Sequence, residues 1–188
     1  MNKKSIKTIF VLLIIMSIKV MSQTLNTNPG ANNLNANLDK YVGTWKWEEN
    51  NTSFIIIFKK ENIILPPINK NVRADILYGF HKFVNNNSII ENSLDFSNTT
   101  YDNKKSSILA GLGREGIGNT LLGSITHLSK NGIGGGKKTV NFKIEYLDST
   151  HIKLVSLENP QGVKLTRTGQ PVYDWSISLP QDIILTKQ

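Results

Sequence analysis

A seven-residue run in the C-terminal half alternates apolar and polar side chains without interruption. The run is Val140–Tyr146, and its apolar members are Val140, Phe142, Ile144 and Tyr146. Because successive side chains of a β-strand point to opposite faces, this pattern puts one face on a core and the other in solvent. Asp148 and Ser149 form a turn signal before the next apolar run, Ile152–Leu157. The two runs are therefore predicted to pair as an antiparallel hairpin.

Segments of the same kind recur along most of the chain and are separated by asparagine, glycine or proline. They are Trp45–Glu48, Phe54–Phe58, Ala74–Val84, Ser88–Phe96, Tyr173–Leu179 and Ile183–Leu185. Asn85, Asn86 and Asn87 join the third and fourth of these as a second hairpin. Many short strands with frequent turns predict an all-β fold, an antiparallel up-and-down barrel, with a β-sandwich as the alternative.

Residues 117–130 fit two structures. Ile117, Leu121, Ile125 and Leu128 are spaced by four, four and three, which suits one face of a helix that ends at Gly132. Gly123 in the interior, followed by Ser124, Ile125 and Thr126, favours a glycine-interrupted strand instead. We prefer the strand and keep the helix as its alternative.

The N-terminus has the pattern of a signal peptide. Three lysines at positions 3, 4 and 7 precede the apolar run Ile9–Met16, which is too short to span a bilayer comfortably. Val20 and Ser22 stand three and one positions before Gln23, as a signal peptidase requires. We expect residues 1–22 to be a signal peptide cleaved after Ser22, and the protein to be exported and periplasmic or secreted.

Removal of residues 1–22 leaves 188 − 22 = 166 residues, which suffice for one domain. Residues 23–37 are asparagine-rich with little apolar mass, and are predicted to be a flexible leader. The domain is predicted to span residues 38–188, and Leu38–Val42 to form a short helical turn before the first strand. The chain has no cysteine, so disulfides, thiolate catalysis and cysteine-ligated metals are excluded.

The segment Leu38–Trp45 resembles the start of lipocalin-like β-barrels, in which a helical turn leads into a Gly-X-Trp signature, here Gly43 and Trp45. A longer stretch, from Leu38 to Lys187, resembles a family of small secreted proteins of unknown function from Gram-negative bacteria. The hallmarks are Gly43–Trp45, Phe54–Lys60, Asp75–Asn87 and Ser178–Leu185.

These resemblances imply a lipocalin-like barrel and supply no catalytic residue. They also imply a structural role for Trp45, which would seal one end of the barrel and pack against a basic side chain from the last strands. Arg167 and Lys187 are the two candidates for that basic partner, and the sequence does not choose between them.

Two glycine-rich segments match nucleotide-binding motifs only in part. Gly111–Gly116 spells G-x-G-x-x-G, but no acidic residue follows about 20 positions later. Gly134–Thr139 resembles a P-loop, yet Asn131 stands at the first glycine position and Lys138 stands where Ser or Thr must bind magnesium. We interpret both as loops and expect no cofactor.

No catalytic or metal-ligating set emerges from the remaining polar residues. His81, His127 and His151 are isolated along the chain, and a site built from them requires convergence in space. Glu48 and Glu49 are adjacent, so on a strand they point to opposite faces. No G-x-S-x-G motif is present. We therefore expect a protein that is not an enzyme, with no catalytic, metal or cofactor residues.

The charge of the mature chain is modest. The signal peptide carries four lysines, which leaves 22 − 4 = 18 basic against 14 acidic residues, or +4. The lysine pairs Lys59–Lys60, Lys104–Lys105 and Lys137–Lys138 are interpreted as solvated strand ends, with weak contact to an anionic envelope surface as the alternative. No basic stripe interleaves with aromatic residues, so no nucleic-acid partner is expected.

The function that these patterns favour is a non-catalytic binding module. A small apolar ligand would lie in the mouth or the interior of the barrel, at residues that the sequence does not identify. The alternative is an envelope-associated module for protein interaction or structure.

Overall fold

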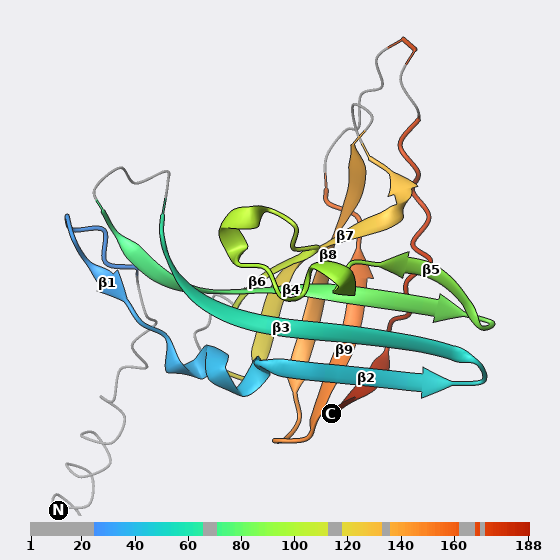
Figure 1. The fold of residues 1–188 in the computed structure, drawn as a ribbon, viewed down its shortest axis with the longest axis horizontal. Coiled ribbons are helices and arrows are strands. Elements are labelled where there is room, and N and C mark those ends of the chain that lie inside the picture. Colours follow the sequence, from blue (N-terminus) through green and yellow to red (C-terminus); the bar gives the residue numbers. More distant parts are fainter. Residues whose placement is uncertain (1–24, 66–70, 113–117, 133–135, 162–167, 170–171) are drawn as a thin grey trace, which may run out of the picture.

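The computed structural model describes residues 25–65, 71–112, 118–132, 136–161, 168–169 and 172–188 (Figure 1). Ten strands and three short 3-10 helices are described in these ranges. In chain order they are β1 (Asn32–Asn33), η1 (Ala36–Tyr41), β2 (Gly43–Glu49), β3 (Thr52–Ile64), β4 (Arg73–Asn85), β5 (Ser88–Asn92), η3 (Leu94–Phe96), η4 (Tyr101–Asn103), β6 (Ile108–Leu112), β7 (Thr120–Asn131), β8 (Lys137–Tyr146), β9 (His151–Glu158) and β10 (Ile183–Lys187). No helix within these ranges is long and apolar enough to cross a membrane.

Eight of the strands form a closed antiparallel barrel. Each pairs with the next along the chain in the order β2, β3, β4, β6, β7, β8, β9, β10, and β10 returns to β2 through the pair Lys46 and Thr186. β5 is a side strand that pairs with β4, and β1 lies parallel to the other end of β4. This confirms the predicted up-and-down barrel over the β-sandwich, and both predicted hairpins, β8–β9 and β4–β5, are present.

The barrel interior is filled by side chains. Its core includes Phe54, Phe58 and Phe142, each at most 5% exposed. The space left among the described core residues is about 10 Å³, which is at the lower limit for one water molecule. An eight-stranded barrel is just wide enough for its side chains to fill it, and three phenylalanines take up that width. Among the described core residues, the interior, one of the two expected ligand positions, therefore shows no room for a ligand.

The Gly-X-Trp signature packs against η1 and against the end of β10. Trp45 is 0% exposed, and its Nε1 donates a 2.7 Å hydrogen bond to the carbonyl of Tyr41 in η1. The ammonium of Lys187 lies 5.1 Å from the centroid of the Trp45 ring. Gly43 has a φ of +133°, and a Cβ there would come within 2.9 Å of Lys187 Cε. The backbone conformation therefore favours glycine, whereas the flexible end of the Lys187 side chain could shift to admit a Cβ.

The structure therefore identifies Lys187 as a basic partner of Trp45, while Arg167 lies outside the described residues. The predicted helical turn before the first strand is also confirmed, because η1 spans residues 36–41 and buries Leu38 and Tyr41 in the core. Part of the segment predicted as a leader contributes to the fold. Asn32 and Asn33 pair with β4, and the Asn35 side chain accepts from the Asn37 amide at the start of η1.

Residues 120–131 are the strand β7, which settles the choice between helix and strand in favour of the strand. The physical reason is the packing of Gly123. A Cβ at this position would collide with the Leu109 carbonyl of β6 and the Phe142 ring of β8. The glycine that interrupts the pattern is the residue that lets three strands approach one another.

The predicted strand Tyr173–Leu179 is wrong. These residues belong to no strand, although Tyr173 and Leu179 are buried. The Asp174 carboxylate accepts from both the amide and the hydroxyl of Ser176, at 2.9 and 2.7 Å. Such local bonds between side chain and backbone compete with a strand ladder.

Candidate functional site: an outer groove beside a buried carboxylate

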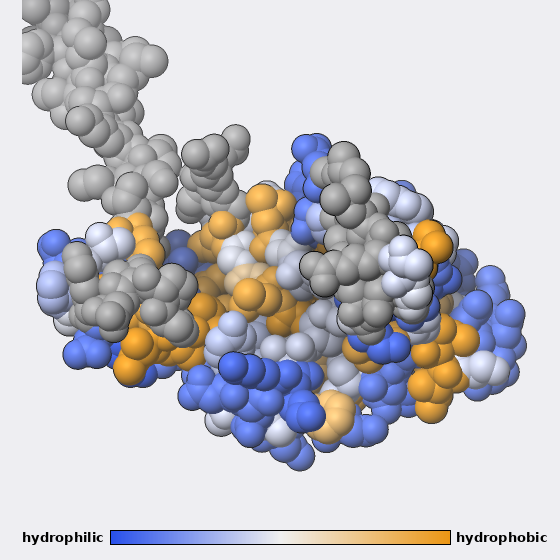
Figure 2. Space-filling model, turned by 90° about the horizontal axis from the view of Figure 1, so that it is seen from above, coloured by the Kyte–Doolittle hydropathy of each residue, from blue (hydrophilic) through white to orange (hydrophobic). Residues whose placement is uncertain are grey.

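A groove of about 650 Å³ runs along the outer face of the barrel. Its walls come from β3, β4, β6 and β7 and from the loop that holds η4. Outward-facing positions form its floor, among them Ile76 of β4 and Leu109 of β6. Figure 2 shows apolar residues gathered in the middle of one face, with hydrophilic segments around them. A cavity of this size is in the range that holds a small molecule.

The wall contributed by η4 is held in place by polar contacts with β3. Lys59 Nζ donates to the carbonyls of Ser97 and Thr99 at 3.0 and 2.8 Å. The Glu61 carboxylate accepts from the Tyr101 amide at 2.9 Å. The Tyr101 ring stands edge-on to Tyr78 of β4, with 5.6 Å between the centroids. The loop therefore has a defined position above the strands, and the groove lies between them.

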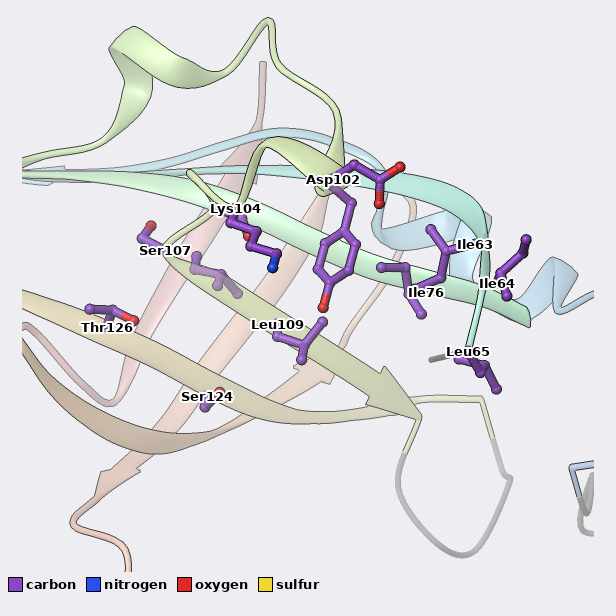
Figure 3. Close-up of a pocket in the computed structure, with 13 residues that line it drawn as sticks. Ile63, Ile64, Leu65, Ile76, Asp102, Lys104, Ser107, Leu109, Ser124 and Thr126 are labelled. Atoms are coloured by element: carbon purple, nitrogen blue, oxygen red, sulfur yellow. The ribbon is translucent and has the colours of Figure 1, made fainter. Parts of the chain in front are cut away.

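The two ends of the groove differ in polarity. Figure 3 shows Ile63, Ile64 and Leu65 together at one end, whereas Lys104, Ser107 and Thr126 lie toward the other. Leu109 lies between the two groups and is 43% exposed. An apolar section that continues into a polar one suits a molecule with two chemically different ends.

Lys104 is the cation of the polar end. Its residue has a φ of +52° and follows η4 as its C-cap. In Figure 3 the Lys104 side chain extends toward β6, while the Asp102 carboxylate points away from Leu109. The Lys104 ammonium makes no hydrogen bond or ion pair with any other described residue. By contrast, the neighbouring Lys105 ammonium lies 5.4 Å from the centroid of the Phe96 ring.

A buried polar cluster adjoins the same end of the groove and centres on Glu91 of β5. Glu91 is 2% exposed, and His81 and His127 are both 0% exposed. Glu91 Oε2 lies 2.8 Å from His81 Nε2, and Glu91 Oε1 is paired with His127 Nδ1. Glu91 Oε1 also accepts a 2.6 Å hydrogen bond from the Ser129 hydroxyl. A buried carboxylate with this many partners is fully satisfied.

Glu91 replaces a missing strand partner. β6 begins at Ile108, and its ladder with β7 ends where the Thr126 amide donates to the Ser107 carbonyl. Beyond that point the amides of Leu128 and Ser129 donate to the Glu91 carboxylate, at 2.9 and 3.0 Å. The Glu91 side chain therefore links β5 to β7 at the end of the barrel where β6 has not yet begun. It also accepts from two backbone amides of β7 that would otherwise lack a partner.

The hydrogen-bond pattern fixes the proton of His127. The Ser178 amide donates to His127 Nε2 at 3.3 Å, and a backbone amide can only donate. Nε2 is therefore an acceptor, and the proton on Nδ1 is donated to Glu91. His81 carries the network further, because its Nδ1 lies 2.8 Å from the Ser107 hydroxyl.

The environment of Glu91 shifts its pKa in two opposing directions. Burial alone raises the pKa, but hydrogen bonds from His127, His81, Ser129 and the Leu128 amide stabilise the ionised form. These bonds outweigh burial and hold the pKa of Glu91 well below its ordinary value of 4.5. The carboxylate is thus ionised in the folded protein throughout the neutral and mildly acidic range.

This shift predicts a pH dependence of stability. Because the folded pKa of Glu91 lies below the unfolded one, its contribution is complete above pH 4.5 and is lost as the pH falls through the folded pKa. We expect the free energy of unfolding, measured in urea from pH 7 to pH 3, to fall below pH 4.5. The fall should be shallower in Glu91→Gln, and equal acid slopes in the two proteins would contradict the assignment to Glu91.

Ser107, His81 and Glu91 have the connectivity of a hydrolase triad, but their environment indicates a structural role. Ser107 borders the groove but is only 4% exposed, and a nucleophile must be accessible to its substrate. The Ser107 hydroxyl also lies 2.8 Å from the Ser93 hydroxyl. We interpret the chain of polar groups as the bond that holds β4, β5 and β6 together.

Of the three isolated histidines, the structure brings together His81 and His127 and leaves His151 apart. His151 lies at the β8–β9 turn, where its Nδ1 is 3.1 Å from Asp148 Oδ1. No group of three or more His, Asp or Glu with the arrangement of a metal site occurs among the described residues. Sequence reasoning missed Glu91, since its partners lie 10 and 36 or more positions away and no spacing rule connects them.

The lysine pairs are not uniformly solvated, so that interpretation was wrong for part of them. Lys138 is 0% exposed, and its ammonium donates to the Ser176 carbonyl at 2.6 Å. Burial lowers the pKa of Lys138. The reason is its place on β8, where it shares the inward face with Val140 and Phe142. The two ammonium groups of Lys59 and Lys60 are likewise held by protein oxygens.

The two glycine-rich segments lie partly in strands and partly outside the described residues. Gly111 and Leu112 are the end of β6, and Lys137–Thr139 are the start of β8. Residues 113–117 and 133–135 lie outside the described ranges. Glu48 and Glu49 are both exposed at the end of β2.

The chain matches a known protein family. A family model described as "Family of unknown function (DUF6705)" matches residues 3–188. No curated protein and no solved structure matches the chain.

Proposed function

Because the chain belongs to this family of unknown function, we propose, from its own geometry, that it is a non-catalytic binding module whose small apolar ligand lies in the outer groove. The observation that carries this proposal is the contrast between two spaces. The groove encloses about 650 Å³, whereas the barrel interior has about 10 Å³. The export signal at Lys3, Lys4, Lys7 and Ile9–Met16 supports action outside the cytoplasm.

The groove suits an apolar ligand because its floor is apolar without being covered by the protein. Ile64 is 51% exposed and Leu109 is 43% exposed, and both line the groove. Contiguous exposed apolar side chains in a concave site, with a few polar groups at one end, are typical of binding sites.

The energetics set the size of such a ligand. Each buried methylene contributes about 0.8 kcal/mol, and association costs at least about 4 kcal/mol. A micromolar dissociation constant corresponds to about 8 kcal/mol. On the order of 15 methylenes, or an equivalent apolar area, are therefore needed. The expected ligand is long or broad, and not a compact molecule of a few carbons.

We expect the uncharged fluorescent probe N-phenyl-1-naphthylamine to bind the purified full chain with a saturable rise in fluorescence. The substitution Leu109→Glu places a carboxylate on the groove floor and should weaken this binding at least tenfold, because a charge loses hydration against an apolar ligand. Leu109 is already 43% exposed, so the substitution should leave the fold intact. Fluorescence titration measures the effect.

The matched control is Ile184→Glu on β10. Ile184 is 50% exposed and lies outside the groove lining, so the variant should bind the probe as the unchanged protein does. Absence of saturable binding, or equal binding by the two glutamate variants, would remove the groove as the ligand site.

A further inference from the structure

Resting on this proposed function, we propose that the ligand is a single-chain anionic amphiphile. Its negatively charged head lies at Lys104 and its tail runs along the apolar end formed by Ile63, Ile64 and Leu65. A long-chain carboxylate is the simplest molecule of this class.

The charge at the polar end selects an anion. Lys104 and Asp102 are the charged residues among those that line the groove. The Asp102 carboxylate points away from Leu109, while the Lys104 side chain extends over the groove toward β6 (Figure 3). The Lys104 ammonium has no hydrogen-bond or ion-pair partner within the described ranges. An ammonium beside an apolar floor attracts a negative head group and repels a positive one.

The hydroxyl groups at this end supply further donors. Ser124 and Thr126 are consecutive outward-facing residues of β7, and both line the groove. Neither hydroxyl bonds to another residue of the described ranges, so both remain able to donate to the oxygens of a carboxylate. By contrast, the Ser107 hydroxyl is held by His81 and Ser93. The head group therefore meets Lys104 and the two β7 hydroxyls.

The strand residues at the opposite end are apolar, and the Asp102 carboxylate on the η4 wall of this side points away from Leu109 (Figure 3). Ile63, Ile64 and Leu65 end β3 and line the groove together with Ile76 of β4. None of these four residues carries a charge. The polarity of the groove floor thus changes once along its length, which matches a molecule with one head and one tail.

The test compares two ligands that differ only in the head group. Dodecanoate and dodecan-1-ol are titrated, each below its aggregation limit, against the bound N-phenyl-1-naphthylamine on the full chain. We expect dodecanoate to displace the probe at a concentration about tenfold lower than dodecan-1-ol does. In Lys104→Met this preference should disappear, and the affinity for dodecan-1-ol should stay within twofold of the unchanged protein.

The matched control is Lys105→Met, which removes the same charge one residue away. Because the Lys105 ammonium stacks over Phe96 and does not line the groove, the preference for dodecanoate should survive. The preference should also shrink between 20 mM and 500 mM salt, since an exposed ammonium is screened by salt. Equal displacement by the two ligands, or equal loss in the two methionine variants, would overturn the proposal while leaving probe binding in the groove intact.

A second measurement distinguishes a free amphiphile from an anionic bilayer. The full chain is floated with vesicles of phosphatidylglycerol and phosphatidylcholine, in parallel with the titrations. We expect dodecanoate to bind and flotation to be unaffected by Lys104→Met. Flotation that depends on Lys104, without displacement by free dodecanoate, would overturn the proposal in favour of an envelope surface.

Discussion

Replacement of Glu91 by glutamine is expected to lower the free energy of unfolding by about 3–5 kcal/mol, because several buried donors lose their charged acceptor, at about 1–3 kcal/mol for each group left unsatisfied. The neutral amide keeps the size of the side chain but presents donor hydrogens to groups that already donate. His127 Nδ1, whose proton is fixed by the Ser178 amide, then has no charged acceptor. The amides of Leu128 and Ser129 also lose a carboxylate that replaces the β6 ladder.

Urea unfolding followed by circular dichroism measures this loss, and Glu49→Gln is the matched control. Glu49 is exposed at the end of β2, so removal of its charge should change the stability by no more than about 0.5 kcal/mol. A Glu91→Gln variant that unfolds at the same urea concentration as the control would show that the cluster does not hold the strands together. The groove should persist in the folded fraction, because its floor is apolar and does not include Glu91.

Truncation of Trp45 to alanine is the second large effect. We expect a loss of about 3–5 kcal/mol, as is usual for a fully buried tryptophan, and a fall in the melting temperature of roughly 10 °C. Trp45 is 0% exposed. Its removal opens a cavity at the barrel end, leaves the Tyr41 carbonyl without its 2.7 Å hydrogen bond and removes the ring against which Lys187 packs.

Thermal unfolding of Trp45→Ala is compared with that of Trp175→Ala. Trp175 is 54% exposed and touches the Tyr173 ring with 4.7 Å between the centroids, so its removal should cost less than about 1 kcal/mol. Equal melting temperatures for the two variants would contradict the sealing role of Trp45. A larger loss for Trp175 would place the critical closure of the barrel in residues 172–182 instead.

The groove was not predictable from the sequence because no single segment contains it. Ile63, Ile76, Leu109 and Ser124 belong to four strands, and their common face depends on the register of the barrel. The filled interior was also hidden, since alternation shows which side chains point inward but not how much space they leave. The Glu91 cluster forms beyond the start of β6 at Ile108. Where β6 starts depends on how the strands pair in the folded barrel.

The sequence by itself determined the class of fold. Alternation in Val140–Tyr146 and the turn residues around the hairpins predict antiparallel strands, because the side-chain period of a strand and the φ values of turns are local properties. A structural role for Trp45 at one end of the barrel was implied only by the resemblance of Leu38–Trp45 to lipocalin-like barrels. Three other features were decided only by the tertiary structure: the filling of the barrel, the hydrogen-bond network of Glu91 and the groove beneath η4. Each depends on side chains that are distant in sequence and meet only when the strands close into a barrel.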